Sequence, residues 1–539
     1  MGFQTSDLWR TPVLNPINKK ARSVPVLNPI DRHGRVFFFS WLGFMLAFWA
    51  WYTFPPLLSV TIKKDLHLTS EQVANSNIVS LVATLAVRFA AGPLCDLMGP
   101  RKVFSLILLV GSIPIGLSPL IKDATGLYII RFFIGILGGS FVPCQVWCTG
   151  WFDKNIVGTA NALSGGWGNA GGGITYFIMP AVYDSLVHRW GHTPGEAWRI
   201  TFVVPLVCLI ACGAGLWLLC EDTPTGKWSE RHNITTDLST NADGVIVPVP
   251  GNITSLPAST TDVGTPLSGK EKEPDLEKAS APKTPLSHTS PVSASSSGTS
   301  TPNSTGARVM TAQNEVILSP TLRTSLPVIF SLHALFHVAT YACSFGGELA
   351  VNSILGAYYL KNFPSLGQTN ASNYAAVFGF LNFVTRPLGG VVGDLVYKLF
   401  SSKFGGRGDT GGLWAKKVWI HVCGLMTGAL LIVIGLVDPK NLGAMVGLVV
   451  IMAIFHEAGN GANFALLPHV YPYANGVLSG VTGAGGNLGG VVFAVIFRFM
   501  DGGTNYAKGF WVIGIIHVAM NLAVCWIPPV PKAQVGEGR

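Results

Sequence analysis

The stretch RFAAGPLCDLMGPRK, Arg88 to Lys102, decides how the rest of the chain is organised. It places one arginine inside an apolar run, eight residues before an acidic turn that is flanked by glycines and followed by basic residues. Eight residues of helix rise about 12 Å. If Asp96 and Arg101 lie at a membrane surface, Arg88 lies near the middle of a hydrocarbon core about 30 Å thick. A charge at that depth costs at least about 2.5–3.5 kcal/mol, so the stretch predicts that Arg88 has a function.

The composition is that of a polytopic membrane protein. Of 539 residues, 49% are hydrophobic and 12% are charged, whereas soluble proteins carry about 25% charged residues. The mean hydropathy is +0.44. The nine cysteines include no CxxC pair, which predicts buried free thiols rather than a disulfide or a metal site. The sequence shows no nucleotide, metal or nucleophile–base motif and no basic patch interleaved with aromatics, so we expect no enzyme, no cofactor and no nucleic-acid partner.

Twelve apolar runs are each close to the ~20 residues that a membrane-spanning helix needs. They form two sets of six, which predict an N-terminal six-helix bundle over 36–220 and a C-terminal one over 326–528. The runs cover residues 36–58, 74–94, 103–121, 127–148, 157–183, 200–220, 326–360, 373–394, 416–437, 442–467, 475–498 and 509–528. The predicted fold class is therefore an all-α membrane protein with twelve transmembrane helices in a lipid bilayer.

Three polar segments lie outside the bundles. Residues 1–35 and 529–539 are predicted as tails, and residues 221–325, rich in Ser, Thr and Pro, as a disordered linker. An even number of spans places both tails on one side, and the basic residues on that side predict that it is cytoplasmic. Ser/Thr-Pro pairs, including the one at Thr284, make the linker a candidate for regulatory kinases, whereas Asn370 is a candidate glycosylation site in an external loop.

The second and eighth runs share a pattern. Arg88 precedes Asp96 by eight residues in the second run, and Arg386 precedes Asp394 by eight residues in the eighth. A glycine four residues before each aspartate also matches. Equivalent features at equivalent places in the two halves indicate an internal repeat.

The fifth and eleventh runs share a second pattern. GGWGNAGG (Gly165–Gly172) and GAGGNLGG (Gly483–Gly490) align around Asn169 and Asn487, with glycines in common on both sides. Together with the first pattern, this predicts two pseudo-symmetric six-helix bundles with a substrate site between them, near the midplane of the membrane.

The repeat also predicts the chemistry of that site. Arg88 and Arg386 would approach each other across the pseudo-two-fold axis, each without a carboxylate of its own, and an anion between them would relieve their repulsion. A guanidinium fork suits a planar oxyanion, and Asn169 and Asn487 would add donors. The alternatives are that each arginine pairs with an acid or with carbonyl groups, that the asparagines bond between helices, and that the glycines only pack helices together.

The opening stretch carries a candidate gate as well. Asp96 ends its helix near Arg101 and Lys102, and Arg131 lies inside the fourth run. We expect these four residues to form a cytoplasmic charge network that holds one half against the other and breaks when the halves separate.

GPLCDLMGPRK resembles the cytoplasmic motif between the second and third spans of the major facilitator superfamily. The two glycine–asparagine stretches resemble the paired nitrate signatures of its nitrate/nitrite porter family, and the long linker resembles that of the family's fungal high-affinity nitrate transporters. The resemblance implies that Arg88 and Arg386 clamp the substrate and that Asn169 and Asn487 line its path. It also implies three aromatic residues in contact with the substrate: Phe141, Tyr341 and Phe345.

The fungal and plant members of that family are proton symporters, and some bacterial members exchange nitrate for nitrite. The resemblance therefore implies uptake of nitrate, and of nitrite, across the plasma membrane by proton-coupled symport with alternating access. A nitrate/nitrite exchanger, a nitrate sensor, and a porter of the same fold for another anion or a sugar remain alternatives. The proton site is not assigned from sequence, although Glu348, His456 and Glu457 are ionisable residues in or near apolar runs.

Overall fold

The computed structural model describes residues 5–15, 18–153, 156–228, 322–403, 410–471 and 474–531. Most of the predicted linker, with its kinase sites, and most of the predicted C-terminal tail lie outside the described residues.

Six membrane-length helical segments make up the first half of the chain, several of them broken by short turns. They are α1 (Arg32–Trp51), continued by α2 (Pro55–Leu57), η2 (Leu58–Ile62) and α3 (Lys63–Asp65); α4 (Ser70–Met98); α5 (Pro100–Leu117), continued by η3 (Ser118–Leu120); α6 (Ala124–Ile134) with η4 (Gly135–Ser140) and α7 (Phe141–Trp151); α8 (Val157–Asn169) with α9 (Gly171–His188); and α10 (Pro194–Thr201) with α11 (Val203–Leu219). A short helix, η1 (Thr5–Leu8), precedes them.

Six further segments make up the second half. They are α14 (Leu322–Ile329) with α15 (Leu332–Asn362); η6 (Pro364–Leu366) with α16 (Gly367–Lys403); α17 (Thr410–Val437); α18 (Leu442–Leu466) with η7 (Leu467–His469); α19 (Asn475–Phe499); and η9 (Asp501–Gly503) with α20 (Tyr506–Ala523). Asn370 lies exposed in the first turn of α16, so its predicted place in a loop is wrong.

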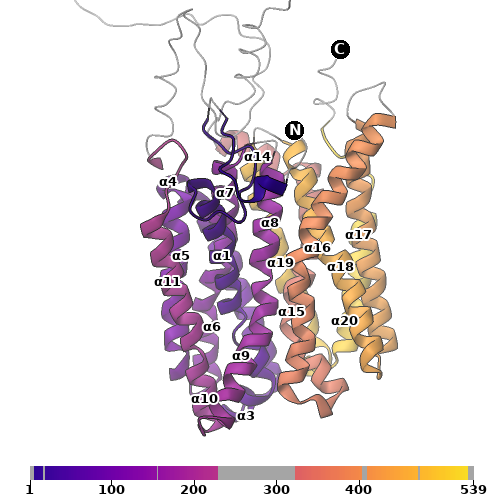
Figure 1. Ribbon diagram of the computed structural model, residues 1–539. Helices are drawn as coiled ribbons and strands as arrows, with labels where there is room; N and C mark the ends of the chain where they lie inside the picture. Colours follow the sequence, from indigo (N-terminus) through magenta and orange to yellow (C-terminus); the bar gives the residue numbers. More distant parts are fainter. Residues whose placement is uncertain are drawn as a thin grey trace, which may run out of the picture.

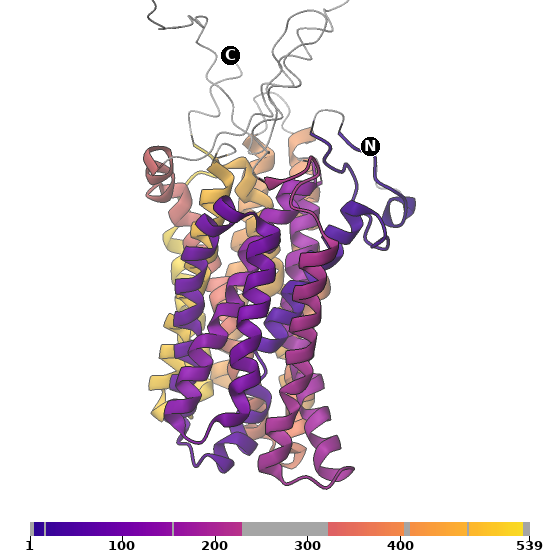
Figure 2. The ribbon, with the colours of Figure 1, turned by 90° about the vertical axis from the view of Figure 1, so that its left-hand side faces the viewer.

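The segments form two bundles that lie side by side (Figure 1). The first half runs from indigo to magenta and the second from orange to yellow, and the first half faces the viewer after a 90° turn (Figure 2). Ten of these segments are long and apolar enough to cross a membrane. The expected all-α fold with two six-helix bundles is confirmed. We call the end of the molecule at α3 and α10 the α10 end (Figure 1).

The turn within the opening stretch depends on one glycine. α4 begins with a capping box in which Thr69 and Gln72 bond reciprocally, and it ends at Met98. Gly99 then adopts φ +91°, a conformation that costs other residues strain. Pro100 follows as the first residue of α5, where its fixed φ favours helix initiation and its missing N–H costs no hydrogen bond. The sequence GP therefore reverses the chain between two membrane-length helices.

The two halves meet along pairs of helices that the repeat makes equivalent. α4 packs against α19, and α8 and α9 pack against α16. At the second contact the backbones touch, because a Cβ at Gly379 would lie 2.8 Å from the Gly173 Cα. Close approach through small residues is the usual packing of membrane helices. Part of the glycine pattern therefore serves packing, as the alternative interpretation held.

Within the second half, Gly461 sets how close α18 lies to α16. We expect Gly461→Ala to destabilise the protein, because a Cβ there would collide with the backbone carbonyl of Arg386. Overpacking of this kind typically costs about 1–3 kcal/mol. The measurement is the melting temperature of the purified protein in detergent. Gly447→Ala is the control, because it lies on the same helix and a Cβ there would meet no atom of another described helix within 4 Å. Equal melting temperatures for the two variants would contradict this contact.

Candidate functional site

Arg88 lies on α4 at the contact between the halves, with 5% of its surface exposed. Its Nε donates to the carbonyl of Gly138 at 2.9 Å, within the first half. Its Nη1 donates to the carbonyl of Gly483 on α19 at 3.3 Å, across to the second half. The remaining nitrogen, Nη2, is buried and has no hydrogen-bond partner among the described residues.

Arg386 lies on α16 and is 3% exposed. Its Nη2 donates to the Tyr341 hydroxyl at 2.9 Å. Its Nη1 lies 3.9 Å from Oε2 of Glu348 and makes no hydrogen bond within the described residues. The expectation that neither arginine has a carboxylate beside it is therefore wrong for Arg386.

One aromatic ring connects the two arginines. The ring centre of Phe345 lies 5.1 Å from the guanidinium carbon of Arg88 and 5.8 Å from that of Arg386. Phe141 lies 5.0 Å from the Arg88 guanidinium and stacks on Phe345. Tyr341 stacks on the same ring at 5.2 Å. The structure thus brings together both arginines and all three aromatics that the resemblance implied, and cation–π contact partly offsets the burial of the two charges.

Each arginine also faces the glycine–asparagine stretch of the opposite half. Arg88 reaches Gly483, four residues before Asn487. Arg386 approaches Gly165, where a Cβ would lie 3.6 Å from the arginine Nε. Gly165 is four residues before Asn169, so the two contacts occupy equivalent places in the repeat. This agreement is direct structural support for the pseudo-two-fold arrangement.

The two asparagines are both buried, but their amides differ. Asn487 donates from Nδ2 to the Gly483 carbonyl at 3.1 Å, the same carbonyl that Arg88 contacts. Its Oδ1 has no partner among the described residues, and neither amide atom of Asn169 has one. A buried amide group left without a hydrogen bond costs about 1–3 kcal/mol. A ligand that accepts hydrogen bonds would recover part of that cost.

The hydrogen-bond donors around the two arginines suit a small anion. At this site three buried donors have no hydrogen-bond partner among the described residues: Arg88 Nη2, Arg386 Nη1 and Asn169 Nδ2. Two of them carry positive charge, and hydrogen bonds from charged donors are about twice as strong as neutral ones. Phe345, between the guanidiniums, would restrict the ligand to a small one. We call Arg88 and Arg386 the arginine pair.

The predicted gate residues do not form one network. Arg101 donates to Asp222 at 3.2 Å and to the carbonyls of Trp217 and Cys220, so its contacts stay within the first half. The backbone carbonyl of Asp96 accepts from the Trp228 side chain at 2.8 Å. Lys102, next to Arg101, is half-buried at the start of α5.

The prediction that Arg131 belongs to the cytoplasmic charge network is wrong. Its Nη1 donates to Ser76 at 3.0 Å and to Asn77 at 2.5 Å, near the beginning of α4. Asp96 lies twenty residues further along that helix, which corresponds to about 30 Å. Arg131 is therefore near the opposite end of the bundle from Asp96. The physical reason is that the fourth segment runs away from the α10 end and Arg131 lies in its second turn.

The sequence identifies Glu348 and Glu457 as ionisable residues in or near apolar runs but predicts no role for them. Both are buried, on α15 and α18, and together they lie beside Arg386. Asn382 donates to Oε1 of Glu348 at 2.8 Å, and Asn460 donates to Oε2 at 2.8 Å. The signal available in the sequence was that two carboxylates fall inside apolar runs, where each charge needs a partner.

A cavity of about 360 Å³ lies between the halves at the α10 end. Its walls come from both halves and include Lys63, which precedes α4, and Lys361, at the end of α15. Asn77, which accepts the hydrogen bond from Arg131, also lines it. We call it the α10-end cavity. Its basic residues would attract anions.

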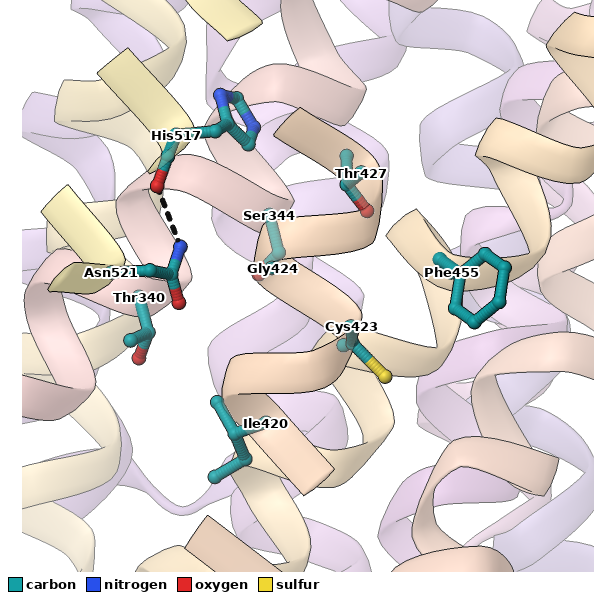
Figure 3. Close-up of a pocket in the computed structure, with 10 residues that line it drawn as sticks. Thr340, Ser344, Ile420, Cys423, Gly424, Thr427, Phe455, His517 and Asn521 are labelled. Atoms are coloured by element: carbon teal, nitrogen blue, oxygen red, sulfur yellow. Dashed lines mark hydrogen bonds between the residues drawn. The ribbon is translucent and has the colours of Figure 1, made fainter. Parts of the chain in front are cut away.

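A second, much smaller pocket lies inside the second bundle, between α15, α17, α18 and α20 (Figure 3). Its volume of about 10 Å³ corresponds to roughly one water molecule. Asn521 donates to the His517 carbonyl at 2.8 Å at its wall, and Thr340 and Ser344 of α15 also line it. Neither arginine of the pair lines this pocket, so it is distinct from the candidate anion site.

Fold and site together define a membrane transporter built from two related helical bundles, with a buried cationic centre where the bundles meet. The chain belongs to the Major Facilitator Superfamily, whose sequence model matches residues 40–396.

Relatives across nearly the full length are transporters by name. The chain is 35% identical to elsinochrome transporter 1 of Elsinoe fawcettii, over 98% of this chain and 99% of the relative. It is 29% identical to high-affinity nitrate transporter 2.3 of Oryza sativa subsp. japonica, over 92% and 77% of the two chains. It is 28% identical to the nitrate/nitrite transporter NrtP of Nostoc punctiforme, over 88% and 89%. The expected resemblance to nitrate/nitrite porters is confirmed.

Solved structures show the same fold. The inward-open xylose transporter XylE of E. coli has a TM-score of 0.58 at 11% identity, covering 93% of this chain and 97% of XylE. A bacterial homologue of the human lysosomal transporter Spinster has a TM-score of 0.55 at 14% identity, covering 92% and 97% of the two chains.

Proposed function

We propose that this protein takes up nitrate, and nitrite, across the plasma membrane by proton-coupled symport with alternating access. The observation that carries the proposal is the arginine pair, with one buried guanidinium from each half and one unpartnered nitrogen on each among the described residues. Relatives named as nitrate transporters support the choice of substrate.

The charge balance at the arginine pair favours an anion. Arg386 has Glu348 at 3.9 Å, whereas Arg88 is held by two backbone carbonyls and makes no ion pair within the described residues. An uncompensated buried charge is costly. Nitrate is a planar ion with three oxygens, so it can accept from both guanidiniums and from Asn169 together. Binding it would draw the two halves together, because the donors come from both.

The α10-end cavity supports entry from outside the cell. The positive-inside rule predicts that the opposite end, with Arg101 and Lys102, faces the cytoplasm, as do both termini. An anion would then enter at the α10 end, pass to the arginine pair, and leave toward the cytoplasm when the halves rock open on that side. Entry of one negative charge against 100 mV costs about 2.3 kcal/mol, so uptake needs protons. One proton per nitrate makes the step electroneutral and two make it favourable.

A second candidate substrate follows from the relative at 35% identity, which is named for transport of elsinochrome. The close stacking of Phe141, Tyr341 and Phe345 around the arginine pair favours a small ion over a large organic compound. Exchange of nitrate for nitrite, and sensing without transport, are further outcomes that the same assay separates.

Transport by the purified full-length protein in liposomes tests the function. With an acidic exterior, we expect saturable accumulation of nitrate and a proton influx that depends on it. Accumulation only when nitrite is trapped inside would indicate an exchanger, and saturable binding without flux would indicate a sensor. Elsinochrome flux without nitrate flux would overturn the proposal.

The α10-end cavity makes a separate prediction. We expect the double substitution Lys63→Gln with Lys361→Gln to raise the KM for nitrate about threefold to tenfold at low ionic strength, because it removes the field that attracts the anion. The difference should shrink at high salt, where exposed charges are screened. Initial uptake rates over a range of salt concentrations provide the measurement.

Lys440→Gln is the matched control for these lysines. Lys440 lies exposed between α17 and α18 and pairs with Asp438 at 2.6 Å, so its charge is already compensated. A threefold or larger rise in KM for Lys440→Gln as well would show that general surface charge, rather than the cavity, determines nitrate entry.

A further inference from the structure

Glu348 and Glu457 form a pair of buried carboxyl groups that the proposed binding of nitrate leaves unexplained. Their residues are 4% and 0% exposed. One amide contacts both, because Nδ2 of Asn460 lies 2.8 Å from Oε2 of Glu348 and 3.5 Å from Oε2 of Glu457. Oε1 of Glu457 is buried without a hydrogen-bond partner among the described residues. We call these two residues the carboxyl pair.

The surroundings supply one positive charge to this pair. Nη1 of Arg386 lies 3.9 Å from Oε2 of Glu348, and this nitrogen makes no hydrogen bond within the described residues. One guanidinium balances one carboxylate. A second buried carboxylate without a partner would cost several kcal/mol. Two carboxyl groups that share one site therefore hold one proton between them while Arg386 remains paired with Glu348.

The other titratable groups near the carboxyl pair are bonded elsewhere or lie further away. They are Tyr52 of α1, Arg88 of α4, Tyr341 of α15, His456 of α18 and His517 of α20. His456 Nε2 meets the Ser344 carbonyl at 2.5 Å, and His517 Nδ1 meets the Ile513 carbonyl at 2.8 Å. Neither histidine has a hydrogen bond to Glu348 or Glu457 among the bonds of the described residues.

We propose that the carboxyl pair is the proton-binding site of the transport cycle and that Arg386 couples it to the anion. This inference rests on the proposed proton symport. When nitrate binds Arg386, the guanidinium shares its charge with the anion, and Glu348 loses its counter-charge. A proton from external water then binds the Glu348 carboxylate, and the pair becomes neutral. After nitrate leaves toward the cytoplasm, Arg386 pairs with Glu348 again and that proton is released on the same side.

The balance of this cycle is one proton bound and one released for each nitrate. Both the nitrate-bound and the nitrate-free states keep the same net charge around Arg386, so uptake of one nitrate with one proton moves no net charge across the membrane. By linkage, nitrate binding and proton binding strengthen each other by the same factor.

Glu348→Gln tests the coupling, because glutamine keeps the shape and can still accept the hydrogen bond from Asn460 but cannot bind or release a proton. Purified wild-type and variant proteins are placed in liposomes that contain a pH-sensitive dye. We expect Glu348→Gln to lower nitrate-dependent proton uptake and nitrate accumulation at least about tenfold. Exchange of labelled for unlabelled nitrate, which needs no net proton movement, should continue and shows that the variant is folded. Glu457→Gln should keep the coupling, because glutamine stands in for the carboxyl group that remains protonated throughout this cycle.

A second readout is independent of transport. Nitrate should raise the melting temperature of the wild-type protein more at pH 5.5 than at pH 7.5, and this difference should vanish in Glu348→Gln. Glu196→Gln is the control, since Glu196 is exposed in the first turn of α10 and glutamine preserves its capping bond with Thr193. It should behave as wild type in both assays.

The outcomes separate this inference from the proposed function. If the wild-type protein couples protons to nitrate and Glu348→Gln keeps that coupling, the carboxyl pair is not the proton site, while proton symport stands. If the wild-type protein exchanges nitrate but moves no protons, symport itself is wrong and the inference fails with it.

Discussion

Arg386→Lys is expected to lower nitrate uptake about tenfold to a hundredfold while the protein remains folded. The guanidinium donates from Nη2 to Tyr341 and places Nη1 beside Glu348, so one planar group contacts both residues at the same time. Lysine keeps the charge but cannot contact both residues and the anion together. Loss of one charge-assisted hydrogen bond costs about 1.5–3 kcal/mol, and each 1.4 kcal/mol is a factor of ten in affinity.

Arg88→Lys should have a similar effect on uptake and a further effect on stability. Arg88 donates to Gly138 in one half and to Gly483 in the other, so its loss removes a hydrogen bond between the halves. We therefore expect a lower melting temperature for Arg88→Lys than for Arg386→Lys. Nitrate uptake in liposomes and melting temperature in detergent separate the two effects.

Arg32→Lys provides the control for both variants. Arg32 forms an ion pair with Glu221 at the surface, and both side chains are more than 40% exposed. Exposed pairs contribute about 0–1 kcal/mol, so nitrate uptake should stay at the wild-type level. Normal nitrate affinity in Arg386→Lys and Arg88→Lys would reject the clamp.

The repeat made much of the site predictable from sequence. The matching Arg-to-Asp spacing and the matching asparagines identified residues that are far apart in sequence but meet in space, because an internal two-fold places equivalent spans against one another. Gly165 and Gly483 illustrate this two-fold relation, since each faces the arginine of the opposite half. Apolar runs of about 20 residues likewise predicted the helices, because membrane thickness fixes their length.

The partners of the charged residues were not predictable in the same way. Glu348 meets Arg386, and Asp222 meets Arg101, only through the packing of different helices. No spacing rule links residues 38 or 121 positions apart. Arg131 is a different case, because the alternation of spans already placed the start of the fourth run away from Asp96. The prediction that Arg131 belongs to the gate does not take into account the direction in which the fourth span crosses the membrane.

Asn169→Ala is expected to raise the KM for nitrate about tenfold to a hundredfold without lowering the melting temperature. Neither amide atom of Asn169 has a hydrogen-bond partner among the described residues, so alanine removes no bond that holds the fold together. Leaving a buried polar group unpaired costs about 1–3 kcal/mol, and its removal can therefore be neutral or stabilising in the absence of nitrate. In the presence of nitrate the same amide would donate to an anion oxygen, and that bond is lost.

Alanine substitutions of Asn487 and Asn521 are compared with Asn169→Ala to separate effects on nitrate affinity from effects on stability. Asn487→Ala removes the hydrogen bond to Gly483 as well, so both the melting temperature and the nitrate affinity should fall. Asn521→Ala removes a hydrogen bond to His517 in the small pocket of the second bundle, so stability should fall while the KM for nitrate stays the same. If Asn169→Ala instead behaves like Asn521→Ala, Asn169 serves helix packing, and the anion is held by the arginine pair without it.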